Sequence, residues 1–322
     1  MKNRKINLKN FSAGRKALGK RILVYIGSAV AAAQVVQLLV EGIQHFINPK
    51  MLPDGFIIPY YNTLSSAALV IPAVIVAVIL AFIKQLNYSS YSNKIKNTNI
   101  TINLEVGDIL TSKDDTIIPC NNIFAYNLDI IGNKSIQAQL TKSIKCKGMS
   151  GEEFIGQQVD KALNTQEFKD ARLMDEPQIF DGKKYHHYPY GLILPIKHSK
   201  KKKDKKFYLL AMSSIVDKGK PTVDHDTLIK SIDSMFGNIQ KNKLTGENLA
   251  MPVMGTGAAK MLEKPKQIVA RYILKRFAQT ASTSCIKNLT LYIYPDDYLK
   301  DEIDIEELRD YIDFLCRYPE NE

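Results

Sequence analysis

The sequence predicts an α/β protein in which a helical hairpin precedes a three-layer α/β/α domain with a mixed sheet. Three observations lead to this fold class. Strand-like and helix-like segments alternate from residue 100 to residue 322. Two long apolar stretches come before that region, and a strongly basic segment precedes the first of them.

The basic segment is residues 1–21. It contains eight lysines and arginines and no acidic residue, so it accounts for most of the formal net charge of +11. A charge excess of this size often indicates a nucleic-acid partner. Its confinement to the residues before an apolar stretch indicates membrane topology instead, so we expect no nucleic-acid partner.

The apolar stretches predict two transmembrane helices within residues 22–86. The first is Ile22–Phe46, and the second covers about 63–84, with no charged residue from Leu64 to Ile83. About 20 apolar residues cross the hydrocarbon core of a bilayer, which is more than an ordinary core helix provides. Three prolines and a glycine between the stretches are typical of a short loop.

Basic residues lie at both ends of this predicted hairpin. They precede the first helix, and Lys84, Lys94 and Lys96 follow the second. The positive-inside rule therefore places both termini in the cytoplasm and the loop outside. A signal peptide cleaved near Ala31 and Ala33 is the alternative, although the apolar run continues past these residues.

Gln34, Gln37 and Glu41 follow a helical spacing in the first predicted helix. A carboxylate facing lipid is costly, so this polar stripe favours a seam or pore between several copies of the chain. Alternatively, Glu41 lies near the outer headgroups and reaches water. Pro72 predicts a kink in the second helix, whose role the sequence does not indicate.

The cytoplasmic part is predicted to be a polar linker, 87–99, followed by one domain, 100–322. Strands are predicted at 100–106, 116–120, 190–196, 207–215, 248–254 and 288–294. Helices are predicted at 135–144, 151–163, 224–240, 266–281 and 304–316. This alternation predicts helices on both faces of a sheet and a ligand site beyond the carboxyl ends of its strands.

Two short segments at strand ends are candidate ligand-binding motifs. In Gly107-Asp108-Ile109, a carboxylate follows a strand and can accept a hydrogen bond from an amino group. Asn121 and Asn122 end an apolar strand and can bond the polar atoms of a ligand. Each pattern by itself also fits an ordinary turn.

The third candidate motif is Gly255-Thr256-Gly257-Ala258-Ala259, which follows a predicted strand. Glycines let backbone N–H groups approach a phosphate, and small side chains leave room for a ligand. The motif is neither a P-loop nor a dinucleotide-binding fingerprint, because the residues that complete those patterns do not follow. The histidines and cysteines show no metal-ligand spacing, so we expect neither a metal nor a further cofactor.

Taken together and in this order, the three motifs resemble the macro domain, and more closely that of membrane-tethered effectors of type II Thoeris anti-phage systems. The resemblance covers about 98–322, and the predicted hairpin matches the same architecture. It implies a macro-like domain that binds an ADP-ribose derivative, in that family histidine-linked ADP-ribose made by a partner TIR-domain enzyme. It also implies a multi-pass protein of the bacterial inner membrane that forms a homo-oligomer, disrupts the bilayer and causes abortive infection.

The same resemblance implies a role for each candidate residue. Asp108 and Ile109 would meet adenine, and Asn121 and Asn122 would lie beside the distal ribose. Ser135 would lie at a helix start near the pocket. The residues that would surround the diphosphate are Gly255, Thr256, Gly257, Ala258 and Ala259.

One departure from the family concerns catalysis. Hydrolytic macro domains have a run of glycines shortly after the Asn segment, whereas this sequence continues from Phe124 to Asp129 and has its next glycine at Gly132. We therefore expect a signal-binding effector with no catalytic residue. The alternatives are a membrane-tethered ADP-ribosyl hydrolase and a non-catalytic anchor that recruits a protein.

Lys200–Lys206 is a basic run that contains one acid, Asp204. It lies between two predicted strands, so we expect a solvated hairpin loop. Attraction to anionic lipid is the alternative.

Overall fold

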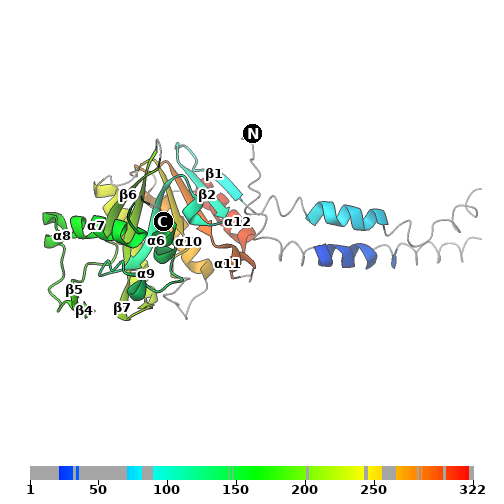
Figure 1. The fold of residues 1–322 in the computed structure, drawn as a ribbon. Helices are drawn as coiled ribbons and strands as arrows, with labels where there is room; N and C mark the ends of the chain where they lie inside the picture. The colour runs from blue at the N-terminus through cyan, green and yellow to red at the C-terminus, as the bar shows by residue number, and fades with distance from the viewer. Residues whose placement is uncertain are drawn as a thin grey trace, which may run out of the picture. The chain divides into compact units, whose positions relative to one another are not determined.

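The structure is a computed structural model, and the residues that it describes are 22–31, 34–35, 71–81, 90–144, 146, 148–200, 203–242, 246–255, 266–280, 283, 285–299 and 302–318. The chain divides into two units, residues 1–89 and residues 90–322. The described residues of the first unit are helical (Figure 1). Within the described part of the chain, no helix combines the length and the apolar character needed to cross a membrane.

The two transmembrane helices therefore stay a prediction. The basic segment 1–21, the predicted loop and much of both predicted spans lie outside the described residues. The same is true of Gln37 and Glu41 in the polar stripe.

The second unit is built on a mixed sheet, which has eight strands among the described residues. The strands β2, β10, β9, β3 and β7 lie side by side in this order and run parallel. Antiparallel strands complete the sheet, with β1 beside β2, and β6 and β8 beside β7. The bounds are β1 Ser90–Lys94, β2 Thr101–Val106, β3 Asp115–Asn121, β6 Ile193–Lys200, β7 Lys203–Asp217, β8 Lys220–Thr222, β9 Asn248–Pro252 and β10 Asn288–Ile293. A separate hairpin pairs β4 Gln178–Phe180 with β5 Lys183–Tyr185.

Helices pack against both faces of the sheet (Figure 1). Their bounds are η2 Ile109–Thr111, α5 Leu128–Ile131, α6 Ile136–Ser143, α7 Gly151–Leu163, α8 Gln166–Asp170, α9 His225–Asn242, α10 Lys266–Thr280, α11 Pro295–Leu299 and α12 Ile305–Arg317. Helices α6 and α7 contact β3 and β6, whereas α9, α10 and α12 contact one another and the strands β7, β10 and β1. The second unit is therefore a three-layer α/β/α domain.

The core lies on both faces of the sheet. On β7, Leu209 and Ala211 belong to a buried cluster with Ile155 of α7. Tyr208 and Leu210 alternate with them and are also fully buried, as expected for a central strand with both faces covered.

The α/β prediction with a mixed sheet is confirmed. The helix predicted at 151–163 coincides with α7, whose first turn is closed by a capping box: Ser150 Oγ accepts from the Glu153 N–H, and the Glu153 carboxylate accepts from the Ser150 N–H. The other predicted strands and helices of the second unit have counterparts whose ends are shifted by a few residues.

The range 87–99 differs from the predicted linker, because it contains β1. This strand pairs with β2 so that Ser90 lies opposite Glu105 and Lys94 opposite Thr101. Its exposed Ser90, Ser92 and Lys94 alternate with half-buried residues, so the strand has no apolar face from which it could be predicted.

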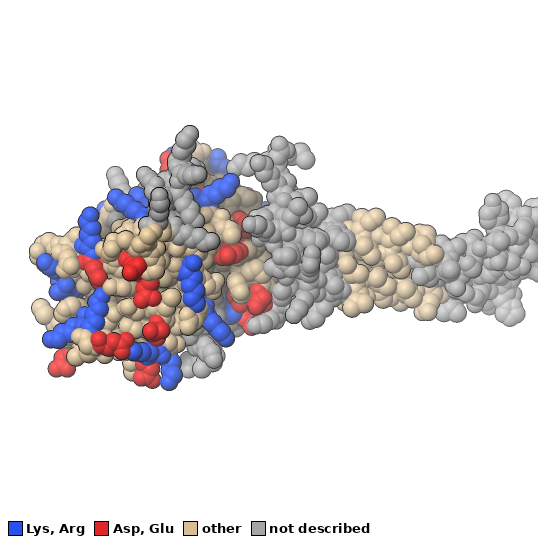
Figure 2. Space-filling model, in the orientation of Figure 1, with Lys and Arg blue, Asp and Glu red and all other residues tan. Residues whose placement is uncertain are grey.

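The basic run 200–206 also differs from a fully solvated loop, because β6 and β7 extend into it and Lys200 pairs with Lys203. Lys205 is half-buried, and its Nζ donates to the Ser112 carbonyl at 2.6 Å and lies 4.5 Å from the centre of the Phe207 ring. On the face of the second unit drawn in Figure 2, basic and acidic side chains are intermixed.

Candidate ligand-binding site

A cavity of about 340 Å³ lies where the central parallel strands end. Residues that follow β2, β9 and β10, the last residues of β3, and the middle of β7 line it. Ligands of open α/β sheets bind at this end of the strands, and the volume is within the usual range for small-molecule sites. The cavity is therefore the candidate functional site.

Five of the residues predicted to bind ligand line this cavity, and their role in binding stays a prediction. They are Asp108, Ile109, Asn121, Ser135 and Gly255. Thr256, Gly257, Ala258 and Ala259 lie outside the described residues. Asn122 is described but is not among the residues that line the cavity.

Asp108 both caps a turn and lines the cavity. Its Oδ1 accepts from the Leu110 N–H at 2.9 Å and thereby starts η2. Its Oδ2 has no hydrogen-bond partner among the described residues, so this oxygen can accept a hydrogen bond from a ligand. Ile109 is buried against Ala250 and Tyr292, which fixes the turn on the sheet.

The two asparagines at the end of β3 have different surroundings. Asn121 is buried in the cavity wall, and its Oδ1 accepts from the Ala125 N–H at 3.0 Å. Asn122 Nδ2 lies 3.4 Å from His187 Nδ1, and the buried Oδ1 of Asn122 has no partner among the described residues. Of the two asparagines, only Asn121 is among the residues that line the cavity.

The start of α6 forms another part of the wall. Ser135 is its N-cap: the Oγ accepts from the Ala138 N–H at 3.0 Å and donates to the Gly132 carbonyl at 3.0 Å. Lys134 is exposed beside it, lines the cavity, and its ammonium has no partner among the described residues. Gln137 is buried and donates to the Ala125 carbonyl at 2.8 Å.

Gly255 is the described part of the predicted glycine motif. It follows β9, is buried, and has φ +75°. Side chains are disfavoured in this left-handed conformation, so a glycine suits the turn.

The sequence-based prediction missed the residues after β10. Tyr294 lines the cavity with 55% of its surface exposed. Partial burial and the nearby charges of Asp296, Asp108 and Asp297 raise the pKa of its hydroxyl. Lys266, at the start of α10, also lines the cavity. The available signal was the aromatic Tyr294 at the end of the predicted strand 288–294.

Met212 and Ser213 of β7 were missed for another reason. The pairing of β3 with β7 shifts at a bulge, because Cys120 pairs with Ala211 but Asn121 pairs with Ser213. Both Met212 and Ser213 line the cavity. An extra residue in one strand leaves no mark in the sequence pattern.

The segment that replaces the glycine run packs away from the cavity. Phe124 is fully buried with φ +49°, and its ring meets Phe168 and Tyr188 with centroids 6.2 and 5.4 Å apart. None of the residues from Phe124 to Asn127 lines the cavity.

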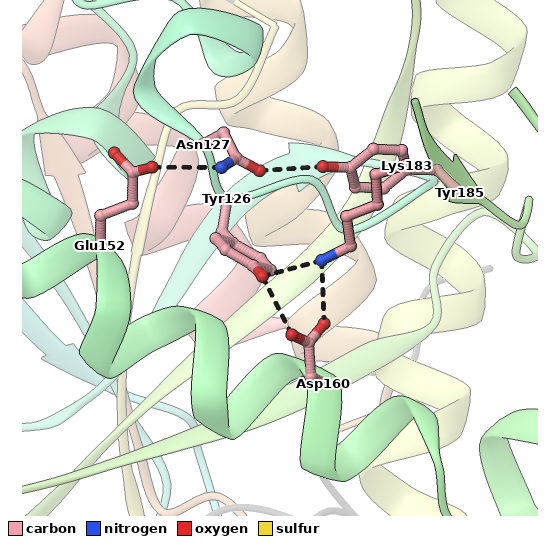
Figure 3. A network of polar contacts seen from close by, with 6 residues as sticks. All are labelled: Tyr126, Asn127, Glu152, Asp160, Lys183 and Tyr185. Carbon is pink, nitrogen blue, oxygen red and sulfur yellow. Dashed lines mark hydrogen bonds and ion pairs between the residues drawn. The ribbon is translucent and has the colours of Figure 1, made fainter. Parts of the chain in front are cut away.

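Polar contacts hold the same segment to α7 and to the hairpin of β4 and β5 (Figure 3). The Tyr126 hydroxyl donates to Asp160 Oδ2 at 2.9 Å and accepts from Lys183 Nζ at 2.8 Å. Asn127 donates to Glu152 at 3.1 Å and accepts from the Tyr185 hydroxyl at 2.8 Å. These side chains anchor the segment rather than face a ligand.

The three-layer fold and the cavity at its strand ends define the class, a macro domain, and the comparison with protein families agrees. The family model described as "Thoeris protein ThsA, Macro domain" matches residues 102–294. The chain belongs to this Thoeris ThsA macro-domain family.

Solved macro domains of Oceanobacillus iheyensis are similar to the chain at low identity. One mutant is 12% identical, with a TM-score of 0.45, over 70% of this chain and 94% of that chain. Another mutant, solved with ADPR, is 12% identical, with a TM-score of 0.45, over 70% and 98%. The structure with ADP is 14% identical, with a TM-score of 0.41, over 66% and 99%. The comparison with curated proteins finds no match.

Proposed function

We propose that the second unit is the sensor of an anti-phage effector and binds an ADP-ribose-derived signal, histidine-linked ADP-ribose made by a TIR-domain protein. The cavity at the ends of the parallel strands carries this proposal, because it combines Asp108, the exposed ring of Tyr294 and Gly255 in one wall. Membership of the Thoeris ThsA macro-domain family supports it.

The chemistry of the wall suits the parts of such a ligand. Asp108 Oδ2 accepts from the amino group of adenine, and the Tyr294 ring stacks on the base. The turn at Gly255, with φ +75°, suits a close approach of the backbone to the diphosphate. At the other end, Asn121 and Lys134 offer polar and cationic groups to the distal ribose and its substituent.

The lack of a glycine run after Asn122 supports retention of the ligand rather than its hydrolysis. Hydrolysis needs a water held next to the anomeric carbon, and a loop of small residues beside the ribose leaves room for it. Here the corresponding segment begins with Phe124 and contains no glycine before Gly132, so it is not a loop of small residues.

Residues 22–86 are proposed to anchor the chain in the inner membrane with both ends in the cytoplasm, as their apolar character indicates. Binding of the signal drives copies of the second unit to assemble, which brings the anchors together and disrupts the bilayer. This coupling requires the ligand to bind the assembled state more tightly than the single chain.

Calorimetry with ADP-ribose on the full 322-residue chain in mild detergent tests the ligand assignment. We expect Asp108→Ala to weaken binding about tenfold or more, because the variant removes the acceptor for the adenine amino group. Asp129→Ala is the matched control, since Asp129 is an exposed acid outside the cavity. Equal affinity of wild type and Asp108→Ala would refute the assignment.

Chromatography on the same samples separates the sensor from the hydrolase. Histidine-linked ADP-ribose incubated with the wild-type chain is expected to be recovered intact. Catalytic release of free ADP-ribose would establish an enzyme instead.

A further inference from the structure

Lys266 is a lysine of the cavity wall whose charge is already paired. Its Nζ lies 2.5 Å from Asp297 Oδ1 and 2.5 Å from Glu302 Oε2. Only 21% of the Lys266 side chain and 9% of the Asp297 side chain are exposed. Burial alone would lower the pKa of Lys266, but hydrogen bonds and attraction to the two carboxylates outweigh it and raise the pKa. The ammonium is therefore charged at neutral pH and held in one place.

The two acids belong to a short segment that runs from Tyr294 through α11 to Glu302 and is called the α11 block here. The Asp297 and Tyr298 N–H groups donate to the Tyr294 carbonyl at 3.0 and 3.3 Å, which starts α11. The Glu302 N–H donates to the Asp297 carbonyl at 3.0 Å. Lys266 thus grips this block at two points, from the first residue of α10.

Tyr294 depends on this block for its position. More than half of its surface lacks contacts, so packing of the ring itself does little to orient it. The backbone that leads into α11 determines where the ring lies on the cavity wall.

We propose that Lys266 is a positioning residue for ligand binding: it holds the block of Tyr294 and α11 so that the Tyr294 ring faces the base, and it does not bind the phosphates itself. The proposal rests on the proposed function. An ammonium between two carboxylates belongs to a group with net negative charge, which repels a diphosphate instead of attracting it. The same ion pairs make a rigid support for an exposed ring.

A double-mutant cycle tests this role. Calorimetry with ADP-ribose compares the wild-type chain with Lys266→Met, Tyr294→Ala and the double variant. We expect Tyr294→Ala to weaken binding about tenfold, the range of base–aromatic stacking, and Lys266→Met to weaken it by up to the same factor. Because Lys266 acts through Tyr294, the double variant is expected to bind no more weakly than Tyr294→Ala.

Two results would overturn the proposal. If the losses multiply in the double variant, Lys266 contacts the ligand directly. If Lys266→Met binds as the wild type does, Lys266 has no part in binding. A wild-type chain that binds no ADP-ribose is a different result, which removes the proposed function itself and the role of Lys266 with it.

Arg271→Met is the matched control. Arg271 lies further along α10 and pairs with Glu307 of α12 at 3.0 Å, outside the cavity. Loss of this ion pair is expected to leave the affinity unchanged. Should Lys266→Met fail to fold, Glu302→Gln weakens the same grip from a residue that does not line the cavity.

Hydrogen exchange without ligand tests, independently of binding, whether the ion pairs of Lys266 hold this segment in place. In Lys266→Met we expect faster exchange of the Asp297 and Tyr298 amides, with unchanged exchange in β3. Unchanged exchange in α11 would show that Lys266 does not hold the block.

Discussion

Lys205 shows how burial changes the chemistry of a single residue. Its side chain is half-buried, and its ammonium donates to the Ser112 carbonyl at 2.6 Å. Burial lowers the pKa of Lys205 to about 8, against the attraction of Asp114, Asp115 and Asp108, which raises it. The folded chain therefore releases this proton at a lower pH than the unfolded chain does.

This difference predicts a pH dependence of stability. Below pH 8 both states are protonated, and folding bears the cost of the buried charge. Between pH 8 and about 9 the unfolded chain binds more protons than the folded chain, so the free energy of unfolding is expected to rise with pH. Above about 9 the raised pKa values of the buried thiols of Cys120 and Cys316 act in the opposite direction, and above about 10 those of Tyr91 and Tyr272, both about 12, add to this effect.

Denaturant titrations of the full chain from pH 7 to 9 measure this rise. In Lys205→Met we expect a smaller rise, because the titrating group is gone. Lys197→Met, on an exposed residue of β6, is expected to keep the wild-type slope. A wild-type stability that is flat or falls from pH 8 to 9 would contradict the prediction.

The cavity residues illustrate how far sequence reasoning reaches at this scale. Asp108 and Asn121 were predicted because polar residues directly after buried strands meet at one end of a parallel sheet. Asn122 was grouped with Asn121, but it does not line the cavity. Lys266 was beyond prediction, because its place in the wall depends on contacts with acids far along the chain.

Among the elements, helix α7 needs Gly156 in order to pack against Tyr126. Tyr126 belongs to the segment 124–129, which stands where hydrolytic macro domains have a run of glycines. A Cβ on Gly156 would come within 2.6 Å of the Tyr126 ring. Helix α7 therefore approaches Tyr126 closely, which permits the contacts between Tyr126, Asp160 and Lys183 (Figure 3).

Two helical glycines form a matched pair of predictions. Gly156→Ala is expected to lower the free energy of unfolding by about 1–3 kcal/mol, because the methyl group forces Tyr126 to move. Gly237→Ala on α9 meets nothing within 4 Å and is expected to raise it by about 0.5–1 kcal/mol, since alanine favours a helix. Chemical denaturation measures both, and equal effects of the two variants would show that Tyr126 does not restrict α7.

Elements with a strong period were predictable, and those without one were not. The helix at 151–163 was correct because its capping residues and apolar spacing agree. Strand β1 was not predicted, since its side chains are polar on both faces. Its position comes from β2 and from α12, where Asp313 accepts hydrogen bonds from Tyr91 and Asn93.

For the whole molecule, the proposed function links the cavity to self-association. If the assembled state binds the signal more tightly, the signal must stabilise assembly by the same free energy. Affinity and oligomeric state are then two measures of one coupling.

Light scattering of the full chain in detergent measures this coupling. We expect saturating ADP-ribose to increase the mass of the protein particle, and the apparent Kd to fall as the protein concentration rises. Asp108→Ala is expected to show neither change at the same ligand concentration. A mass that stays constant while ADP-ribose binds would separate binding from assembly.

The pairing of β1 has a mechanical consequence. Ser90, the first residue of the second unit, lies opposite Glu105, and Glu105 lies opposite Tyr292 of the cavity wall. Tension applied through the chain before Ser90 would act first on the pairing of Ser90 with Glu105 and last on the pairing of Lys94 with Thr101. A pull on the chain would therefore strain the sheet beside the cavity before it strained any other part of β1.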